Sequence, residues 1–213
     1  MIALIIKIVL AYMLGSVSGS MLMGSLRHVD IRESGSGNAG GTNAFRTQGL
    51  KFALPVVLID IGKGLLAAWL FPQLSIDVLS ESVSPEIQML TCGFAAVIGH
   101  CYPLWHGFKG GKGAATAVGA LLVIQPAALL PMLATWILTL IVSGWVGLAT
   151  VLGALCLIPA FFWLQASVPE LVFAITLALF VVFTHRSNLR NLMKGTEHRF
   201  EKARIKNWFD RAG

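Results

Sequence analysis

The chain has 213 residues, of which 56% are hydrophobic and only 12% are charged, and its mean hydropathy is +0.76. Soluble domains carry about 25% charged residues, so this composition excludes an ordinary soluble domain and leaves a surplus of apolar side chains to face lipid. The formal net charge is +6, and the three cysteines are scattered and odd in number, which argues against a disulfide framework. We expect one all-α membrane domain over residues 1–213.

Long apolar stretches predict a polytopic bundle of about seven transmembrane helices, because a spanning helix needs about 20 apolar residues. In chain order the segments are 2–26, 52–71, 86–104, 114–124, 127–142, 145–164 and 168–184. The fourth and fifth are short, and we interpret them as half-helices, which are tolerated where they pack inside protein. The first segment runs past the length of a signal-peptide core, so we expect it to remain uncleaved.

Basic residues gather in the loop 27–51, in the loop between the third and fourth segments, and in the tail after Thr184. Under the seven-segment count these regions fall on one side of the membrane, and the loops on the other side contain no Lys or Arg. Positively charged loops stay cytoplasmic, which predicts an external N-terminus and a cytoplasmic C-terminus. All five histidines lie toward the same side, so we expect one site facing the cytoplasm. The end of the chain, about 198–213, is predicted to be an amphipathic basic tail on anionic lipid.

The segment 34–46 combines glycines with short polar side chains and one arginine. Glycines let backbone N–H groups face a ligand without an intervening Cβ, and hydroxyl and amide groups add donors. A loop of this kind binds an anion, usually a phosphate. A flexible linker is the alternative, but a linker does not need Asn38, Thr42, Asn43 and Arg46 among its glycines.

A second glycine-rich region, 99–113, ends where the short fourth segment begins, and it carries Lys109 and Lys112. Lysines and glycines at a helix N-terminus form an anion site, because the helix dipole adds partial positive charge there. The spacing is not that of a nucleotide P-loop, since Gly113 follows Lys112. A simple positive anchor on the cytoplasmic side is the alternative.

A third region, 184–197, follows directly on the last apolar segment. If helical geometry continues there, His185 and Asn188 are three apart and share a face. A basic tail on anionic lipid is the alternative for this region, although it explains His185, Asn188 and Glu197 less well than a site does.

Two features inside the segments concern packing. Asp60 and Lys63 are three apart on one face of the second segment, where a structural ion pair is at least as good an interpretation as a direct role. Gly15, Gly19 and Gly24 in the first segment predict close helix packing.

Signatures of other enzyme classes are missing from the sequence. There is no Gly-x-Ser-x-Gly elbow, no His followed five positions later by Asp (His28 with Glu33 comes nearest), and no carboxylate cluster suited to magnesium. His100, Cys101 and His106 lack a fourth ligand at zinc spacing, so we expect no metal and no other cofactor.

Taken together, the three regions resemble the bacterial membrane acyl-phosphate:glycerol-3-phosphate acyltransferase family (PlsY-type). The matching residues stand in the family's order and span nearly the whole chain: 29–33, 35–38, 41–43, Arg46, Asp60, 63–64, 99–100, 108–113, 185–186, Asn188, Gly195 and Glu197. The family usually has Pro-Gly-Ala where this chain has Ala-Gly-Gly at 39–41, and a serine where this chain has Gly147. A polar contact to substrate is then either missing or supplied by Ser143.

The resemblance implies a multi-pass protein of the bacterial inner membrane with its active site facing the cytoplasm. It implies transfer of a fatty acyl group from acyl phosphate to the 1-hydroxyl of sn-glycerol 3-phosphate, giving lysophosphatidic acid and phosphate, the first step of phospholipid synthesis. The expected partners are these substrates, membrane lipid and, transiently, the soluble enzyme that makes acyl phosphate, with no nucleic acid. A transporter or channel for a phosphorylated small solute is the alternative, since short glycine-ended segments resemble broken transporter helices. Transporters of that kind have matching halves, and none are visible here.

Acyl phosphate is already activated, so the enzyme mainly has to position two anions, and it needs neither a nucleophile of its own nor a metal. We expect catalytic roles for Arg46, Lys112, His185 and Asn188, with His185 or a substrate phosphate oxygen as the general base. The expected substrate-binding residues are Ser36, Gly37, Asn38, Gly41, Thr42, Asn43, Lys109, Gly110, Gly111 and Glu197.

Overall fold

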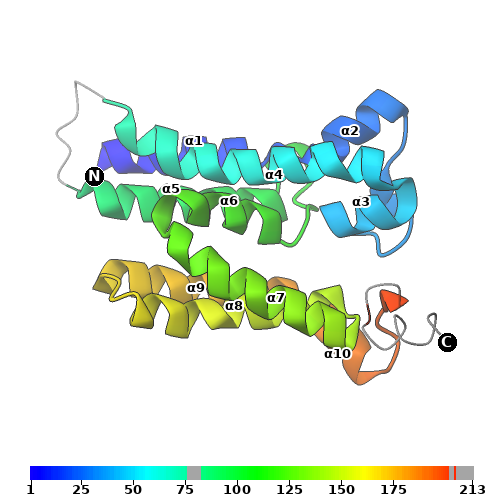
Figure 1. Cartoon of the computed structure of the whole chain (residues 1–213). Helices are drawn as coiled ribbons and strands as arrows, with labels where there is room; N and C mark the ends of the chain where they lie inside the picture. The colour runs from blue at the N-terminus through cyan, green and yellow to red at the C-terminus, as the bar shows by residue number, and fades with distance from the viewer. Residues whose placement is uncertain (76–82, 202–203, 205–213) are drawn as a thin grey trace. The chain divides into compact units, whose positions relative to one another are not determined.

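The computed structural model describes residues 1–75, 83–201 and 204 (Figure 1). Over these ranges the chain is helical and contains no β-strand, which confirms the predicted all-α class. The chain divides into two compact units, Met1–Pro126 and Ala127–Gly213. A single domain over residues 1–213 stays a prediction.

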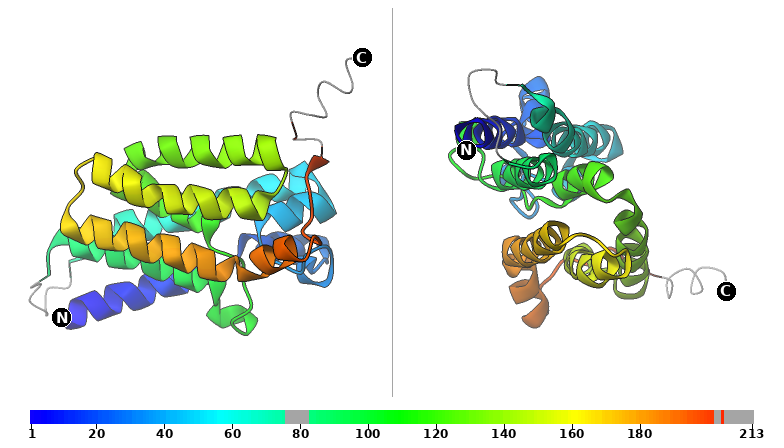
Figure 2. Two further views of the ribbon diagram at one scale, coloured as in Figure 1. Left: turned by 90° about the horizontal axis from the view of Figure 1, so that it is seen from below. Right: turned by 90° about the vertical axis from the view of Figure 1, so that its left-hand side faces the viewer.

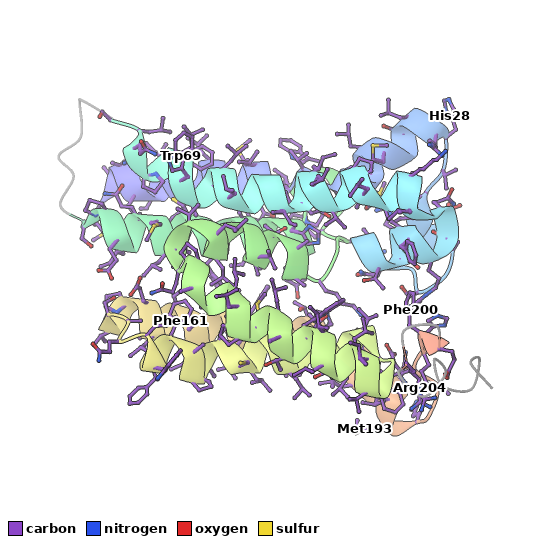
Figure 3. The ribbon with its side chains drawn as sticks, viewed as in Figure 1. His28, Trp69, Phe161, Met193, Phe200 and Arg204 are labelled. Carbon is purple, nitrogen blue, oxygen red and sulfur yellow. The ribbon has the colours of Figure 1, made fainter. Side chains whose placement is uncertain are left out.

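Unit 1 is a helical bundle with a polar end. Its elements are α1 (Ile2–Gly15), α2 (Gly19–Arg27), η1 (Ile31–Glu33), α3 (Gly41–Gln48), α4 (Leu50–Leu70), η2 (Phe71–Gln73), α5 (Pro85–Cys101), η3 (Leu104–His106) and α6 (Ala114–Ile124). The helices α1, α4, α5 and α6 run alongside one another, and α2 and α3 lie at the end away from the N-terminus (Figure 1). Figure 3 marks the two ends of the unit, with His28 after α2 and Trp69 near the end of α4.

All seven predicted apolar segments are helical in the structure. Among the described residues, five stretches are long and apolar enough to cross a membrane: Ile2–Arg27, Leu50–Gln73, Pro85–His106, Pro126–Ser143 and Val146–Trp163. A sixth follows if Val168–Thr184 and Arg186–Met193, bent by 54°, count as one span. The fourth predicted segment is confirmed as a short helix of 11 residues, α6. The half-helix interpretation is wrong for the fifth, because the turn at Pro126–Ala128 extends α7 to an 18-residue span. The orientation of the termini stays a prediction.

The predicted first helix is not continuous, because it breaks at residues 16–18, between α1 and α2. Two groups of α4 stabilise the break: Lys63 Nζ donates to the carbonyl of Val17 at 2.6 Å, and the Gly19 N–H donates to Asp60 Oδ1 at 3.2 Å. Lys63 and Asp60 are buried, and Lys63 Nζ lies 3.1 Å from Asp60 Oδ1. This geometry supports the interpretation of the two residues as a structural ion pair.

Small residues let the helices of unit 1 approach closely. A Cβ on Gly24 would meet the carbonyl of Val29, in the turn after its own helix, so this contact is not packing between helices. The predicted packing role of Gly15 and Gly19 is confirmed, since a Cβ on either would meet a backbone oxygen of another helix, α5 or α4. The same is true between α4 and α6, where a Cβ on Gly64 or Gly119 would meet the backbone of the other helix. Close backbone contact at small residues is the usual packing of helices in a membrane.

Unit 2 consists of α7 (Leu129–Ser143), α8 (Val146–Trp163), α9 (Val168–Thr184) and α10 (Arg186–Met193). Each of the first three packs against the next, and α10 bends away from α9 (Figure 2). A capping box of Ser167 and Glu170 begins α9 by satisfying N–H groups that have no partner within the helix.

The start of the predicted basic tail packs against the turn between α7 and α8. The Phe200 N–H donates to the carbonyl of Gly144 at 2.8 Å, and Arg199 Nε donates to the carbonyl of Ser143 at 2.9 Å. The Arg199 guanidinium also lies 4.4 Å from the centre of the Trp145 ring. Figure 3 labels Phe200 at this end of unit 2. The rest of the predicted tail, 202–203 and 205–213, lies outside the described residues, and lipid binding by the tail stays a prediction.

Candidate active site

The first glycine-rich region is part loop and part helix. Residues 34–40 form a loop, and α3 begins directly after it at Gly41. Thr42 and Arg46 therefore lie on a helix, although the amino-acid composition of the segment 34–46 is typical of a loop. The arrangement still suits an anion, because the first N–H groups of a helix have no partner within their own helix.

Asn43 holds this loop together. Its Nδ2 donates to the carbonyls of Ile31 and Ser34 at 2.9 and 3.1 Å, and its Oδ1 accepts the N–H of Ser36 at 2.9 Å. The residue is only 1% exposed. Asn43 thus shapes the loop, and its direct contact with substrate stays a prediction.

The second glycine-rich region folds back on the end of α5. The Gly110 N–H donates to the carbonyl of Cys101 at 3.2 Å, and the Gly111 N–H donates to the carbonyl of His100 at 3.1 Å. A Cβ on Gly111 would meet the His100 ring, so the loop lies directly on that side chain. Because α5 takes up these N–H groups, the glycines allow the close approach and leave anion contacts to the lysine side chains.

A cavity of about 700 Å³ lies where the two glycine-rich regions meet. Its lining is Asp30, Arg32, Glu33, Gly37, Trp105, His106, Gly107, Lys109 and Gly110. The structure thus brings together three predicted site residues: Gly37, Lys109 and Gly110. The other predicted residues of unit 1 lie outside this lining: Ser36, Asn38, Gly41, Thr42, Asn43, Arg46, Gly111 and Lys112. Among the lining residues that sequence reasoning missed, those of the charged run 29–33 had the clearest signal, since that run carries part of the family resemblance.

The charges in the cavity are partly paired. Arg32 forms a fork with Asp30, with Nη2 2.7 Å from Oδ2 and Nε 3.0 Å from Oδ1. The Arg32 hydrogen bond lowers the pKa of Asp30, and the bond to Asp30 raises the pKa of Arg32, so both groups are charged at neutral pH. The lining thus holds two cations, Arg32 and the exposed Lys109, and two carboxylates, Asp30 and Glu33, with Arg32 already paired to Asp30, so Lys109 is its cation best suited to an anion.

Metal ligands do not gather in the described part of the chain. Within residues 1–75, 83–201 and 204, no group of three or more His, Cys, Asp or Glu side chains could hold an ion. His100, one of the three candidates at the sequence level, instead places Nδ1 3.3 Å from Asp60 Oδ1. Metal-independent activity stays a prediction.

The third predicted region lies in unit 2, at the bend between α9 and α10. Helical geometry does not continue unbroken, because α9 ends at Thr184 and a new helix begins at Arg186. His185, at the bend, is buried, and its Nδ1 lies 2.9 Å from the carbonyl oxygen of Val181. A carbonyl only accepts, so this contact favours the tautomer with the proton on Nδ1 and the lone pair on Nε2. A general base at Nε2 needs this tautomer.

Asn188 is held between two neighbours. Its Nδ2 donates to Glu197 Oε1 at 2.6 Å, across a turn in which Gly195 has a φ of 71°. On its other side, a Cβ on Gly147 would lie 2.7 Å from Asn188 Cβ, so Asn188 packs directly against the backbone at Gly147. Ser143 donates its hydroxyl to the carbonyl of Thr139, one turn back in α7, at 2.6 Å. Direct substrate contacts of Glu197 and Ser143 stay predictions.

Comparisons with known proteins agree over nearly the whole chain. The model of a family described as glycerol-3-phosphate acyltransferase matches residues 5–195. A glycerol-3-phosphate acyltransferase of Symbiobacterium thermophilum is 38% identical over 191 residues, which are 90% of this chain and 92% of the relative. The enzyme of the same description from Pseudomonas paraeruginosa is 41% identical over 195 residues, 90% of this chain and 97% of the relative.

Two solved structures have a similar fold. Both are crystal structures of PlsY (YgiH), an integral membrane glycerol 3-phosphate acyltransferase, one in a glycerol 3-phosphate form and one in a lysophosphatidic acid form. Each is 32% identical to this chain, with TM-scores of 0.82 and 0.80. The alignments cover 92% of this chain and 95% and 94% of the solved chains.

Proposed function

This chain belongs to the glycerol-3-phosphate acyltransferase family, and on that premise we propose that it transfers a fatty acyl group from acyl phosphate to the 1-hydroxyl of glycerol 3-phosphate. The observation that carries the proposal is the cavity of unit 1, where two glycine-rich regions meet Arg32 and Lys109. The glycerol 3-phosphate and lysophosphatidic acid forms of the solved relatives correspond to a substrate and a product of this reaction. The alternative of a solute transporter loses its support, because relatives that match about nine-tenths of this chain are acyltransferases.

Both substrates carry phosphate, so the protein first has to offset the repulsion between two anions. We assign this task to Arg46, which lies in the first glycine-rich region, and to Lys109 and Lys112, which lie in the second. Backbone and side-chain donors of the first region, Ser36, Gly37, Asn38, Gly41 and Thr42, hold the acyl phosphate in this scheme. The same donors stabilise the negative charge that develops on the carbonyl oxygen in the transition state.

The transfer forms one carbon–oxygen bond and breaks another. The 1-hydroxyl oxygen of glycerol 3-phosphate attacks the carbonyl carbon of acyl phosphate, the bond from that carbon to the phosphate oxygen breaks, and inorganic phosphate leaves. The hydroxyl proton passes to His185 Nε2 or to an oxygen of the departing phosphate. The bond from His185 Nδ1 to Val181 favours the first route, because it leaves the lone pair on Nε2.

The proposed reaction takes place at the cytoplasmic face of the bacterial inner membrane. The apolar helices are suited to a multi-pass protein, and the one-sided distribution of Lys and Arg supports this orientation. Acyl phosphate then arrives from a soluble enzyme that docks transiently on the same face. A cysteine introduced at 109 should react with an impermeant thiol reagent only from the cytoplasmic side, and labelling from the periplasm would contradict the orientation.

The decisive experiment supplies purified protein in detergent with acyl phosphate and glycerol 3-phosphate. We expect phosphate and lysophosphatidic acid to form in equal amounts, and we expect turnover to survive exhaustive chelation. Acyl thioesters serve as the control donors. Product formed from a thioester but not from acyl phosphate would overturn the proposed donor, and activity lost on chelation and restored by a divalent ion would overturn the metal-free mechanism.

A further inference from the structure

Three groups lie close to one oxygen of Asp60 deep in unit 1. The Gly19 N–H donates to Asp60 Oδ1 at 3.2 Å, Lys63 Nζ forms an ion pair with it at 3.1 Å, and His100 Nδ1 lies 3.3 Å from it without a hydrogen bond. Asp60, Lys63 and His100 are 1%, 3% and 4% exposed. Buried charges are costly unless their partners stay in place, so the cluster tolerates little displacement.

One side of this Asp60 cluster binds backbone groups at the break between α1 and α2. Val17 offers a carbonyl at the end of α1, where Lys63 Nζ binds it at 2.6 Å, and Gly19 offers the first N–H of α2 to Asp60. The carbonyl end of a helix is partially negative and the N–H end partially positive, so each charged group faces the end of opposite sign. The cluster therefore determines where α1 stops and α2 starts.

The other side of the cluster supports the second glycine-rich region. The His100 carbonyl accepts the Gly111 N–H at 3.1 Å, and the His100 imidazole ring occupies the space where a Cβ on Gly111 would lie. Lys112 is the next residue along the chain. The same region is tied to the helix break, since the Leu104 N–H donates to Ser16 Oγ at 3.3 Å. Movement of His100 would thus move the backbone that carries Lys112.

We propose that Asp60 and His100 are positioning residues, which from the helix break set the loop that presents Lys112 to a substrate phosphate. The role presupposes the acyl transfer proposed above, although neither side chain lines the cavity. The competing explanation is a purely structural role, in which loss of the cluster lowers stability and leaves substrate affinity as it was.

The chain offers a matched control at the other end of α1. Lys7 is fully buried, and its Nζ donates to Gln88 Oε1 at 2.7 Å and to the carbonyl of Pro72 at 3.2 Å. This contact joins the same long helices as the Asp60 cluster does, but it lies near the start of α1 and not at the break. Lys7→Met therefore removes a buried polar contact of the same kind without touching the second glycine-rich region.

The experiment compares wild type, His100→Leu, His100→Asn and Lys7→Met by KM for glycerol 3-phosphate, kcat and thermal midpoint in detergent. We expect His100→Leu to raise KM at least about tenfold, since displacement of a binding group by about 1 Å has effects of that size or larger. His100→Asn places an amide where Nδ1 stood and should reverse most of the increase. Lys7→Met should lower the thermal midpoint and leave KM unchanged. Asp60→Asn is unsuitable as the main variant, because it deprives buried Lys63 of its counter-ion.

The positioning role is overturned if His100→Leu leaves KM unchanged, if Lys7→Met raises KM by the same factor, or if His100→Asn is no better than His100→Leu. Should His100→Leu fail to fold, His100→Gln takes its place with the same expected result, because its amide reaches toward Gly111 and not toward Asp60. A wild type that releases no phosphate from acyl phosphate contradicts the proposed donor instead. In that case the rise of the thermal midpoint on adding glycerol 3-phosphate measures substrate affinity in place of KM. An equal rise in the wild type and the three variants overturns the positioning role.

Discussion

Gly147→Ala measures how much the reaction depends on the position of Asn188. A Cβ at 147 would lie 2.7, 2.8 and 2.9 Å from Cβ, Cγ and Nδ2 of Asn188. Carbon atoms prefer separations of about 3.5–4.0 Å, so Asn188 has to move by about 1 Å and strain its bond to Glu197. Overpacking of this kind costs about 1–3 kcal/mol, and a 1 Å misplacement can cost about a hundredfold in rate. We expect kcat/KM to fall by about tenfold to a hundredfold, with a modest loss of thermal stability.

The assay is phosphate release from acyl phosphate in the presence of glycerol 3-phosphate, together with the thermal midpoint of each variant. Gly62→Ala is the matched control, because a Cβ at 62 has nothing within 4 Å and the exchange removes only the poor helix propensity of glycine. Its kcat/KM should equal that of the wild type. Parental kcat/KM in Gly147→Ala would refute the reasoning, since the displaced amide would then be irrelevant to turnover.

Three further perturbations test the charges and the base. Lys112→Ala should raise KM for glycerol 3-phosphate about tenfold or more, because a hydrogen bond to a charged group contributes about 1.5–3 kcal/mol. Lys194→Ala, at an exposed lysine, is the control, and near-parental turnover in Lys112→Ala would contradict the proposed contact between Lys112 and the phosphate. His185→Asn keeps a donor near the Nδ1 position and loses Nε2, so kcat should fall about a hundredfold or more at unchanged KM; a retained kcat would exclude His185 as the base. Asp30→Asn tests the pH dependence of stability. The bond from Arg32 lowers the pKa of Asp30 in the folded protein, so its stabilisation is fully present above the ordinary value of 3.8 and is lost as pH falls through that value toward the folded-state pKa. The thermal midpoint of the wild type should fall more steeply than that of Asp30→Asn between about pH 5 and pH 3, and parallel curves would contradict the contribution of the Asp30–Arg32 pair.

The sequence located the apolar helices well and their interruptions poorly. Segments 114–124 and 168–184 coincide with α6 and α9, because transfer to lipid acts on each residue's own hydropathy. The break at 16–18 was not predicted from the same profile, although Ser16 and Ser18 interrupt the apolar run, since serine and glycine are common within spanning helices. Backbone groups at the break are satisfied by Asp60 and Lys63, some 40 residues away along the chain, a contact that no local pattern indicates.

The candidate site shows the same division. Glycines, lysines and the family motifs indicated phosphate chemistry, and the cavity lining does lie within the run 29–33 and the two glycine-rich regions, but residue type did not single out Asp30, Arg32 or His106 as lining residues. Asn43 looked like a ligand by residue type, yet its amide is used within the loop, which depends on three backbone groups that no spacing rule identifies.

By itself, the sequence determined that this is a helical membrane protein and which family it belongs to, and it predicted which stretches bind phosphate, because composition and motif are properties of residues taken locally. Only the tertiary structure decided where the first helix breaks, which side chains meet at the cavity, how close Gly147 lies to Asn188, and which backbone carbonyl lies against His185 Nδ1. Each of these depends on a contact between residues brought together by folding, and its energy has no counterpart in the one-dimensional pattern.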